Sequence, residues 1–454
     1  MSGAGERMRD TLRLGGGAGF AGDRLDAPID LAERGALDYL VLECLAERTI
    51  ALAQLRRRRD PTTGYDARLG ERIESLLPIL ARRGIRLLGN FGAANPLAAA
   101  DAIVAIAKRL RIPISVAAVT GDDVLDALDL DAPTMERGVP LSHYAPLVSA
   151  NAYLGAEAML PALASGADIV VTGRVADPSL FVAPLMHEYG WAPDDVDRLA
   201  RGTVVGHLLE CAGQLCGGYF ADPGPKDIPA MAHLGFPYAD VTPDGDAVVS
   251  KVAGTGGRIT VATATEQLLY EVTDPHGYLT PDVTADFSSV ALAETGPDRI
   301  AVQGARGRAR PEQLKVSVGY IAGYIGEGEI GYAGTNALAR ARLAGEIVRE
   351  RIAGRFPELR IDLIGSTSLH GRAINVDERP YEVRLRVAGR AFSRDEAALI
   401  GDEVEALYTN GPAGGGGARK YVNEQIGIVS TLIDRERVPS AVTIRQWSAD
   451  AEAV

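Results

Sequence analysis

The chain has 454 residues, of which 46% are hydrophobic and 24% are charged. These proportions are typical of a globular protein, and they exclude disordered, collagen-like and membrane-embedded chains. The 47 basic and 60 acidic residues give a net charge of −13 at pH 7, so we expect no nucleic acid or membrane partner. At roughly 100 to 200 residues per domain, the length predicts two or three compact units.

The cysteines and the N-terminal sequence indicate where the protein works. Cys44, Cys211 and Cys216 are too few and too odd in number for a disulfide framework, and they favour a reducing compartment. The start, MSGAGERMRDTLRLGGG, lacks the apolar run of a signal peptide. No stretch approaches the roughly 18 apolar residues that a membrane span requires. We therefore expect a cytoplasmic protein.

The N-terminal part alternates short β-rich runs with longer segments of helical period, which is typical of βαβ units. Successive residues of these runs are apolar, as expected for strands covered by helices on both faces. The fold class predicted is therefore α/β, with a mainly parallel Rossmann-like sheet. Strands are predicted at residues 11–15, 38–43, 85–89, 112–119 and 168–172, and helices at residues 69–83 and 96–111.

Polar residues follow each of these predicted strands. Because open α/β sheets bind ligands beyond the carboxyl ends of their strands, we expect these residues to meet at one edge. They are the glycine-rich residues 15–24, Glu43, Asn90, residues 120–123, Arg174 and Asp177.

A helix predicted at residues 204–215 carries His207, Glu210 and Cys211 on one face, because they are spaced at i, i+3 and i+4. The first two are an acid–base pair, and the third is a candidate thiolate nucleophile or a small core residue. The spacing of Cys211 and Cys216, with one nearby histidine, is not that of a zinc site. A divalent metal held by His207, Glu210 and distant carboxylates is an alternative.

After residue 286 the sequence becomes β-rich, with helices predicted at residues 333–352 and 394–407 and a last strand near residues 426–433. This order predicts a smaller α+β two-layer sandwich. We place the boundary near residue 285, which gives an α/β ligand-binding domain at residues 1–285 and an α+β domain at residues 286–454. The glycine run at residues 414–417 is interpreted as a flexible loop.

The spacing Gly17-x-Gly19-x-x-Gly22, followed by an acidic residue about 20 positions later, resembles a dinucleotide fingerprint. However, Pro28 predicts a late helix start, and Asp23 would oppose a pyrophosphate. Dinucleotide binding, a glycine loop that shapes a different site, and a tight turn all remain open.

Two further cations are candidates for anion binding. Arg174 could hold a carboxylate or phosphate in a two-pronged hydrogen bond with Asp177 orienting it, or the two could form a structural pair. Lys251 precedes a glycine-rich turn that contains Thr255 and Gly256, whose backbone N–H groups could receive an anion or a developing oxyanion.

Long blocks of the chain resemble the acyclic terpene utilisation family, AtuA, and together they cover nearly all of it. The resemblance implies a role in bacterial breakdown of citronellol and geraniol through branched acyl-CoA intermediates, without a stated chemical step. Many members carry or accompany a small extra domain, which we expect this chain to lack, so a separate small subunit is a candidate partner. The blocks are GAGFAGDR, LDYLVLECLAERTIALAQLRRRRDPTTGYD, GADIVVTGRVADPSL, GTVVGHLLECAGQLCGGYFADPGPKD, the segment from GFPYADV to ADFSSV, and GPAGGGG.

We therefore predict an enzyme acting on a small branched or unsaturated carboxylate, or its CoA thioester, by proton transfer at carbon: hydration, dehydration, isomerisation or C–C cleavage. No cofactor is predicted beyond CoA as part of the substrate and the metal alternative above. The candidate acid and base groups are Glu43, Asp177, His207 and Glu210, and the candidate groups for the carboxylate or thioester oxygen are Arg24, Arg174 and Lys251.

Two other functions stay open. One is an NAD(P)-linked oxidoreductase that uses residues 17–22, and the other is a non-catalytic scaffold that works with a small subunit. In each case a homo-oligomer is expected on general grounds.

Overall fold

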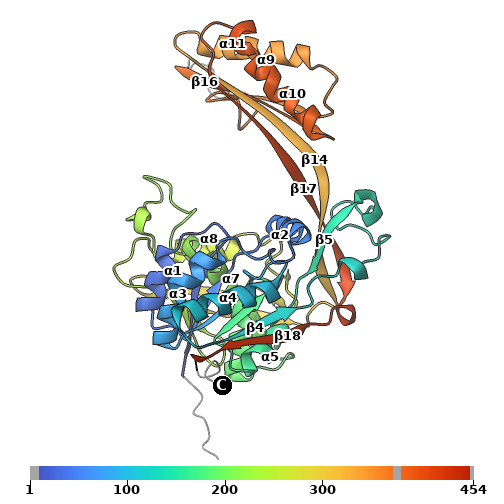
Figure 1. The fold of residues 1–454 in the computed structure, drawn as a ribbon. Coiled ribbons are helices and arrows are strands. Elements are labelled where there is room, and N and C mark those ends of the chain that lie inside the picture. The colour runs from blue at the N-terminus through green and yellow to red at the C-terminus, as the bar shows by residue number, and fades with distance from the viewer. Residues whose placement is uncertain (1–9, 372–379, 450–454) are drawn as a thin grey trace, which may run out of the picture. The chain divides into compact units, whose positions relative to one another are not determined.

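The computed structural model describes residues 10–371 and 380–449. The first nine residues, part of the segment for which no signal peptide was expected, lie outside the described residues. The chain divides into two compact units, one formed by Met1–Gly319 with Ile428–Val454 and the other by Tyr320–Gly427 (Figure 1). The boundary expected near residue 285 falls inside the first unit. The reason is that strands β11 (Ala291–Gly296) and β12 (Arg299–Gln303) extend the sheet of that unit.

The described part of the first unit is built on a ten-stranded sheet in which five neighbouring strands run parallel. These are the five strands predicted from the apolar runs. In their order across the sheet they are β1 (Leu12–Ala18), β2 (Tyr39–Leu42), β3 (Arg86–Gly89), β6 (Ile169–Thr172) and β4 (Ile114–Thr120).

Antiparallel strands complete the sheet, so it is mixed and not mainly parallel. Strands β7 (Pro237–Val241) and β8 (Ala247–Lys251) continue it beyond β1 and lead to β12 and β11, while β18 (Ala441–Trp447) pairs with β4. The parallel order β1-β2-β3-β6-β4 differs from the 3-2-1-4-5-6 order of a Rossmann sheet. The Rossmann-like prediction is therefore not confirmed, because the added strands come from segments remote in sequence.

Helices cover both faces of the parallel strands, as predicted. In β2, Leu40 and Leu42 join the apolar core of one face of the sheet. Tyr39 alternates with them and points to the other face, where its hydroxyl contacts Glu188. The first face carries α1 (Asp26–Arg34), α3 (Leu69–Arg83) and α4 (Pro96–Leu110), which lie side by side in Figure 1, and the second carries α6 (Ser179–Tyr189) and α7 (Val196–Glu210).

Shorter elements surround this sheet in the first unit. Strand β5 (Leu147–Ala152) pairs with β14 (Gln313–Ala333). The remaining elements are α2 (Glu47–Arg59), α5 (Leu160–Ala164), α8 (Val261–Leu269) and a three-stranded sheet of β9 (Tyr278–Leu279), β10 (Thr284–Asp286) and β13 (Arg306–Arg308).

The second unit has two layers, with α9 and α10 packed on one face of a sheet through an apolar core. The two helices predicted here from periodicity are present. No helix among the described residues is long and apolar enough to cross a membrane. The elements are α9 (Ala337–Arg351), β15 (Leu359–Ile364), β16 (Glu382–Ala391), α10 (Arg394–Glu405), α11 (Leu407–Asn410) and β17 (Gly416–Asp434), with the distal part of β14.

Candidate functional site

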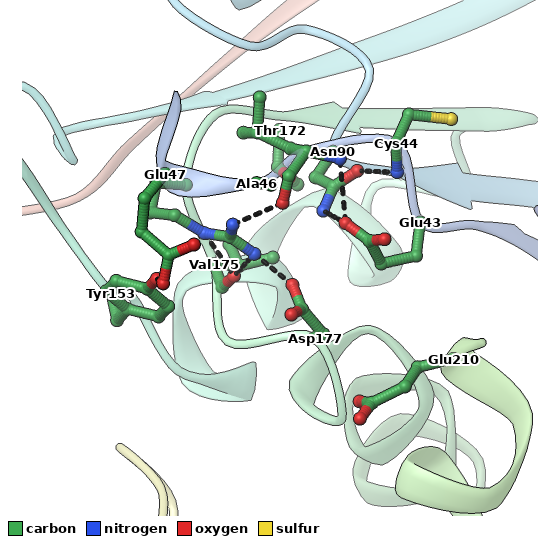
Figure 2. Close-up of polar contacts among 12 residues, drawn as sticks. Glu43, Cys44, Ala46, Glu47, Asn90, Tyr153, Thr172, Val175, Asp177 and Glu210 are labelled. Atoms are coloured by element: carbon green, nitrogen blue, oxygen red, sulfur yellow. Dashed lines mark hydrogen bonds and ion pairs between the residues drawn. The ribbon is translucent and has the colours of Figure 1, made fainter. Parts of the chain in front are cut away.

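The carboxyl ends of β2 and β3 are joined by the side chain of Asn90. Its Nδ2 donates to Glu43 Oε1 at 2.8 Å, and its Oδ1 accepts the N–H of Cys44 at 2.6 Å (Figure 2). The Leu45 N–H also donates to Glu43 Oε1, at 2.7 Å. Asn90 and Glu43 are both buried, so each strand tip satisfies polar groups of the other.

Arg174 follows β6 and is 1% exposed. Its guanidinium donates to the carbonyl oxygens of Leu45 and Val175 and to the carboxylate of Asp177, and it lies 4.6 Å from the ring centroid of Tyr153. These contacts direct its donors to the protein itself. Arg174 thus holds Asp177 and the neighbouring backbone, which favours the structural pair over a two-pronged ligand contact.

The loop after β4 holds the backbone of Arg174 through the side chain of Asp122. The Asp122 carboxylate accepts the N–H of Arg174 at 2.9 Å and the amide of Asn151 at 2.8 Å. Burial raises the pKa of Asp122 to about 6. Four of the five predicted strand tips therefore contribute to one connected network, and the geometry agrees with the general position of sites in open sheets.

Three carboxyl groups gather beside this network: Glu43, Asp177 and Glu210 (Figure 2). Burial raises the pKa of Glu43 and Glu210 well above the usual value, and the nearby charge of Asp177 raises both further. Burial also raises the pKa of Asp177, although Arg174 acts against this. Their ionisations are linked, because a charge on one of these carboxyls makes ionisation of the others less favourable.

His207 and Glu210 form a buried pair on α7, as their spacing predicted. His207 Nδ1 lies 2.8 Å from Glu210 Oε1, and its ring packs against Tyr278 and Phe287. Burial lowers the pKa of His207 to about 4, with partial compensation from backbone groups of residues 267 and 268. The imidazole is therefore neutral at pH 7, and the contact between Nδ1 and Glu210 Oε1 can carry a proton shared by the pair.

Cys211 directly follows Glu210, the last residue of α7, so the helix predicted at residues 204–215 ends earlier than expected. Burial raises the pKa of the Cys211 thiol, and the charge of Glu210 raises it further. It is therefore a thiol at neutral pH, which disfavours the thiolate nucleophile considered from the sequence. Cys216 is fully buried in the apolar interior.

Asp177 faces a cavity of about 310 Å³ in the first unit. Its side chain is 34% accessible even though protein surrounds it, because it lines this hollow. The apolar wall contains Met135, Ala176, Leu279, Leu314, Leu432 and three prolines, and the other polar or charged lining residues are Glu47, Tyr153, Glu271, Tyr278, Thr280, Gln313 and Lys315.

Several of these lining residues were missed by the sequence reasoning. Tyr153 donates to Glu47 at 2.6 Å, and Lys315 Nζ lies 3.4 Å from the same carboxylate. Although burial would raise the pKa of Glu47, the Tyr153 hydrogen bond and Lys315 lower it overall. Glu271 has a φ of 59°, an uncommon backbone conformation for a residue other than glycine that is enriched at functional sites. No local pattern identifies these residues, since they come from four separate segments.

The glycine-rich segment begins in strand β1, continues into the turn that follows it, and lies close to the end of α7. A Cβ on Gly16 would lie closer than 3.0 Å to the carbonyl of Leu209, and one on Gly19 would lie 2.7 Å from the backbone of Cys211. The glycines thus let the end of α7 approach β1, which is the alternative in which they shape a different site.

This segment lacks the features of a dinucleotide loop. The N–H of Gly19 donates to Asp23 at 2.9 Å, and Gly17 lies inside β1 while helix α1 begins only at Asp26. A Cβ on Gly22 would lie 2.5 Å from the ring of Phe20, so the loop at this position is closed by its own side chain. The loop therefore satisfies its own donors, and nothing in its geometry favours the NAD(P) alternative.

The other predicted anion-binding groups are engaged in their own loops and are not among the residues that line the cavity. Arg24 pairs with Asp26. Lys251 donates to the carbonyl of Thr255 at 2.9 Å and pairs with Asp298 at 3.3 Å. The Gly256 N–H donates to the carbonyl of His233 at 2.7 Å, so this glycine turn has no free donor there. Glycine turns of this kind close on themselves, and sequence alone does not distinguish them from anion sites.

Metal binding finds no support in the described ranges. Within residues 10–371 and 380–449, no group of three or more His, Cys, Asp or Glu is arranged to hold an ion. The alternative of a metal on His207 and Glu210 therefore lacks the further ligands that it requires.

The family model described as acyclic terpene utilisation family protein AtuA matches residues 12–444. The chain belongs to the AtuA family. This confirms the resemblance seen in the sequence blocks, and it ties the chain to the utilisation of acyclic terpenes, the process in the family's description. No curated protein and no solved structure matches the chain. Membership in this family does not name a reaction.

Proposed function

We propose that this AtuA chain is an enzyme that moves a proton at carbon in a branched or unsaturated acyl compound, a free carboxylate or its CoA thioester. The class of reaction is that of a hydratase, lyase or isomerase. The observation that carries the proposal is the position of Asp177, a carboxyl of raised pKa on the wall of a largely apolar cavity.

A carboxyl with a raised pKa is suited to this chemistry. General acid–base catalysis is most efficient when the pKa of the group lies near the working pH. Burial supplies the raised value at Asp177, and Arg174 keeps the ionised form accessible by hydrogen bonding to it. Asp177 in its ionised form can therefore take a proton from a carbon next to a carbonyl group and return it to the same or another carbon.

Glu210 and His207 lie near Asp177 and are candidates to accept and return the proton that it removes. Glu210 interacts with the charge of Asp177 and is paired with the neutral imidazole of His207. Loss of a β-hydroxyl as water, with the removed proton returned to the leaving oxygen, gives dehydration, and return of the proton at a different carbon gives isomerisation. Lys315 and Tyr278 line the cavity and could donate to the carbonyl oxygen as negative charge develops there.

The apolar wall of the cavity can pack against a branched hydrocarbon chain. Burial of apolar surface contributes about 25 cal/mol per Å². A volume of about 310 Å³ lies at the lower end of the range of small-molecule pockets, roughly 300–1,000 Å³. The cavity therefore suits an acyl chain with its carbonyl head, whereas the nucleotide part of a CoA thioester would remain outside.

Proton exchange in D2O tests the proposal. Purified protein is incubated with a panel of branched and unsaturated acids and their thioesters, and loss of α- and γ-proton signals is followed by NMR. We expect exchange with at least one compound, and a loss of about 100-fold or more for Asp177→Asn, the scale on which general acid–base groups contribute. Asp30→Asn, which changes a surface carboxylate paired with Arg34, is the matched control and should retain the rate. Absence of exchange with every compound would reject the function.

A further inference from the structure

We propose that the cavity selects acyl groups whose carbonyl is uncharged, an ester or thioester, over the corresponding free carboxylate. This inference rests on the proposed function, because it concerns the substrate class of the same cavity. It follows from the balance of charges around the cavity.

Carboxyl groups dominate the charged lining. Glu47, Asp177 and Glu271 lie on the wall, and they come from three separate parts of the chain. Two more, Glu43 and Glu210, lie behind the wall and interact with the charge of Asp177. Burial raises the pKa of Glu43, Asp177 and Glu210, and charge on a neighbouring carboxyl raises each of them further, so an added negative charge is unfavourable here.

The cations do not offset this crowding for a ligand. Arg174 is 1% exposed and directs its donors to Leu45, Val175 and Asp177. Among the described residues that line the cavity, Lys315 is the one cation, and its Nζ lies 3.4 Å from Glu47. Lys315 is therefore the one cation on the described wall that a ligand can contact, and its positive charge is already offset by Glu47, so it does not balance the full charge of an anionic head group.

A free carboxylate in this cavity would add a further negative charge, so it must enter together with a proton, on itself or on a wall carboxyl. Its apparent affinity should then fall as the pH rises, by up to about tenfold per pH unit. A thioester carbonyl brings no charge. It accepts a hydrogen bond from Lys315 or from a protonated carboxyl and needs no proton to enter.

Binding of one matched pair of probes tests the inference: 3-methylbut-2-enoate and its N-acetylcysteamine thioester. Calorimetric titrations are run between pH 6 and pH 8 with the full chain. We expect the thioester to bind with little dependence on pH and the carboxylate to bind more weakly, with the affinity falling toward pH 8. Glu271→Gln and, separately, Glu47→Gln remove one wall charge each and should improve carboxylate binding by about tenfold or more relative to the thioester.

Glu266→Gln is the matched control, because Glu266 pairs with Lys226 on the surface and does not line the cavity. It should leave the preference unchanged. Equal binding of both probes at every pH would overturn the inference, as would equal effects of the control and the two cavity variants, or no binding of either probe. Loss of proton exchange with an intact preference for the thioester would refute the proposed function alone.

Discussion

Asp122 offers a test of the network that supports Arg174. The Asp122 carboxylate is 4% exposed and accepts the Arg174 N–H and the Asn151 amide. Burial raises its pKa to about 6 from the ordinary value of 3.8. The folded protein therefore holds a proton on Asp122 between about pH 4 and pH 6 that the unfolded chain has released, and this contribution to stability is lost as the pH rises through that window.

The magnitude follows from the size of the shift. At about 1.4 kcal/mol per pKa unit, a rise of roughly two units corresponds to about 3 kcal/mol between pH 4 and pH 7. Asp122→Asn removes the titrating group and loses one acceptor, at a pH-independent cost of about 1–3 kcal/mol. The stability advantage of the wild-type protein over Asp122→Asn should thus shrink by about 3 kcal/mol from pH 4 to pH 7.

Urea unfolding of both proteins, measured across this pH range, gives the difference directly. Comparing the two proteins cancels the titration of all other groups, and Asp30→Asn serves as a surface control for the change from Asp to Asn. If the wild-type and Asp122→Asn stabilities stay parallel from pH 4 to pH 7, the reasoning about Asp122 is refuted.

Three further changes test other parts of the site. Gly16→Ala should destabilise the protein by about 1–3 kcal/mol in thermal unfolding, because its Cβ would lie closer than 3.0 Å to the Leu209 carbonyl; unchanged stability would contradict this close approach. Asn90→Ala should lower stability by a similar amount and lower proton exchange, because it leaves buried Glu43 without its amide donor; normal exchange would show that this link is dispensable. Cys211→Ala should retain exchange within about twofold, since the thiol is not ionised at neutral pH; loss of exchange in a folded variant would restore its candidacy.

Local sequence patterns predicted the part of the fold that depends on short-range chemistry. Runs of apolar residues on both alternating faces identified the five parallel strands, and turn residues identified where they end. Because parallel strands share one carboxyl edge, the same reasoning placed Glu43, Asn90, Arg174 and Asp177 in one region, and helical spacing paired His207 with Glu210.

The tertiary structure decided which of these groups face a ligand cavity. Lys251 and Lys315 are both lysines, and the sequence alone does not show which of them faces a ligand. In the structure Lys251 contacts a glycine turn and Asp298, whereas Lys315 lines the cavity. Likewise, the antiparallel strands β7, β8 and β18 join the sheet from distant segments. Pairing between remote segments depends on which surfaces are left to bury after the local elements form, and no local periodicity encodes that choice.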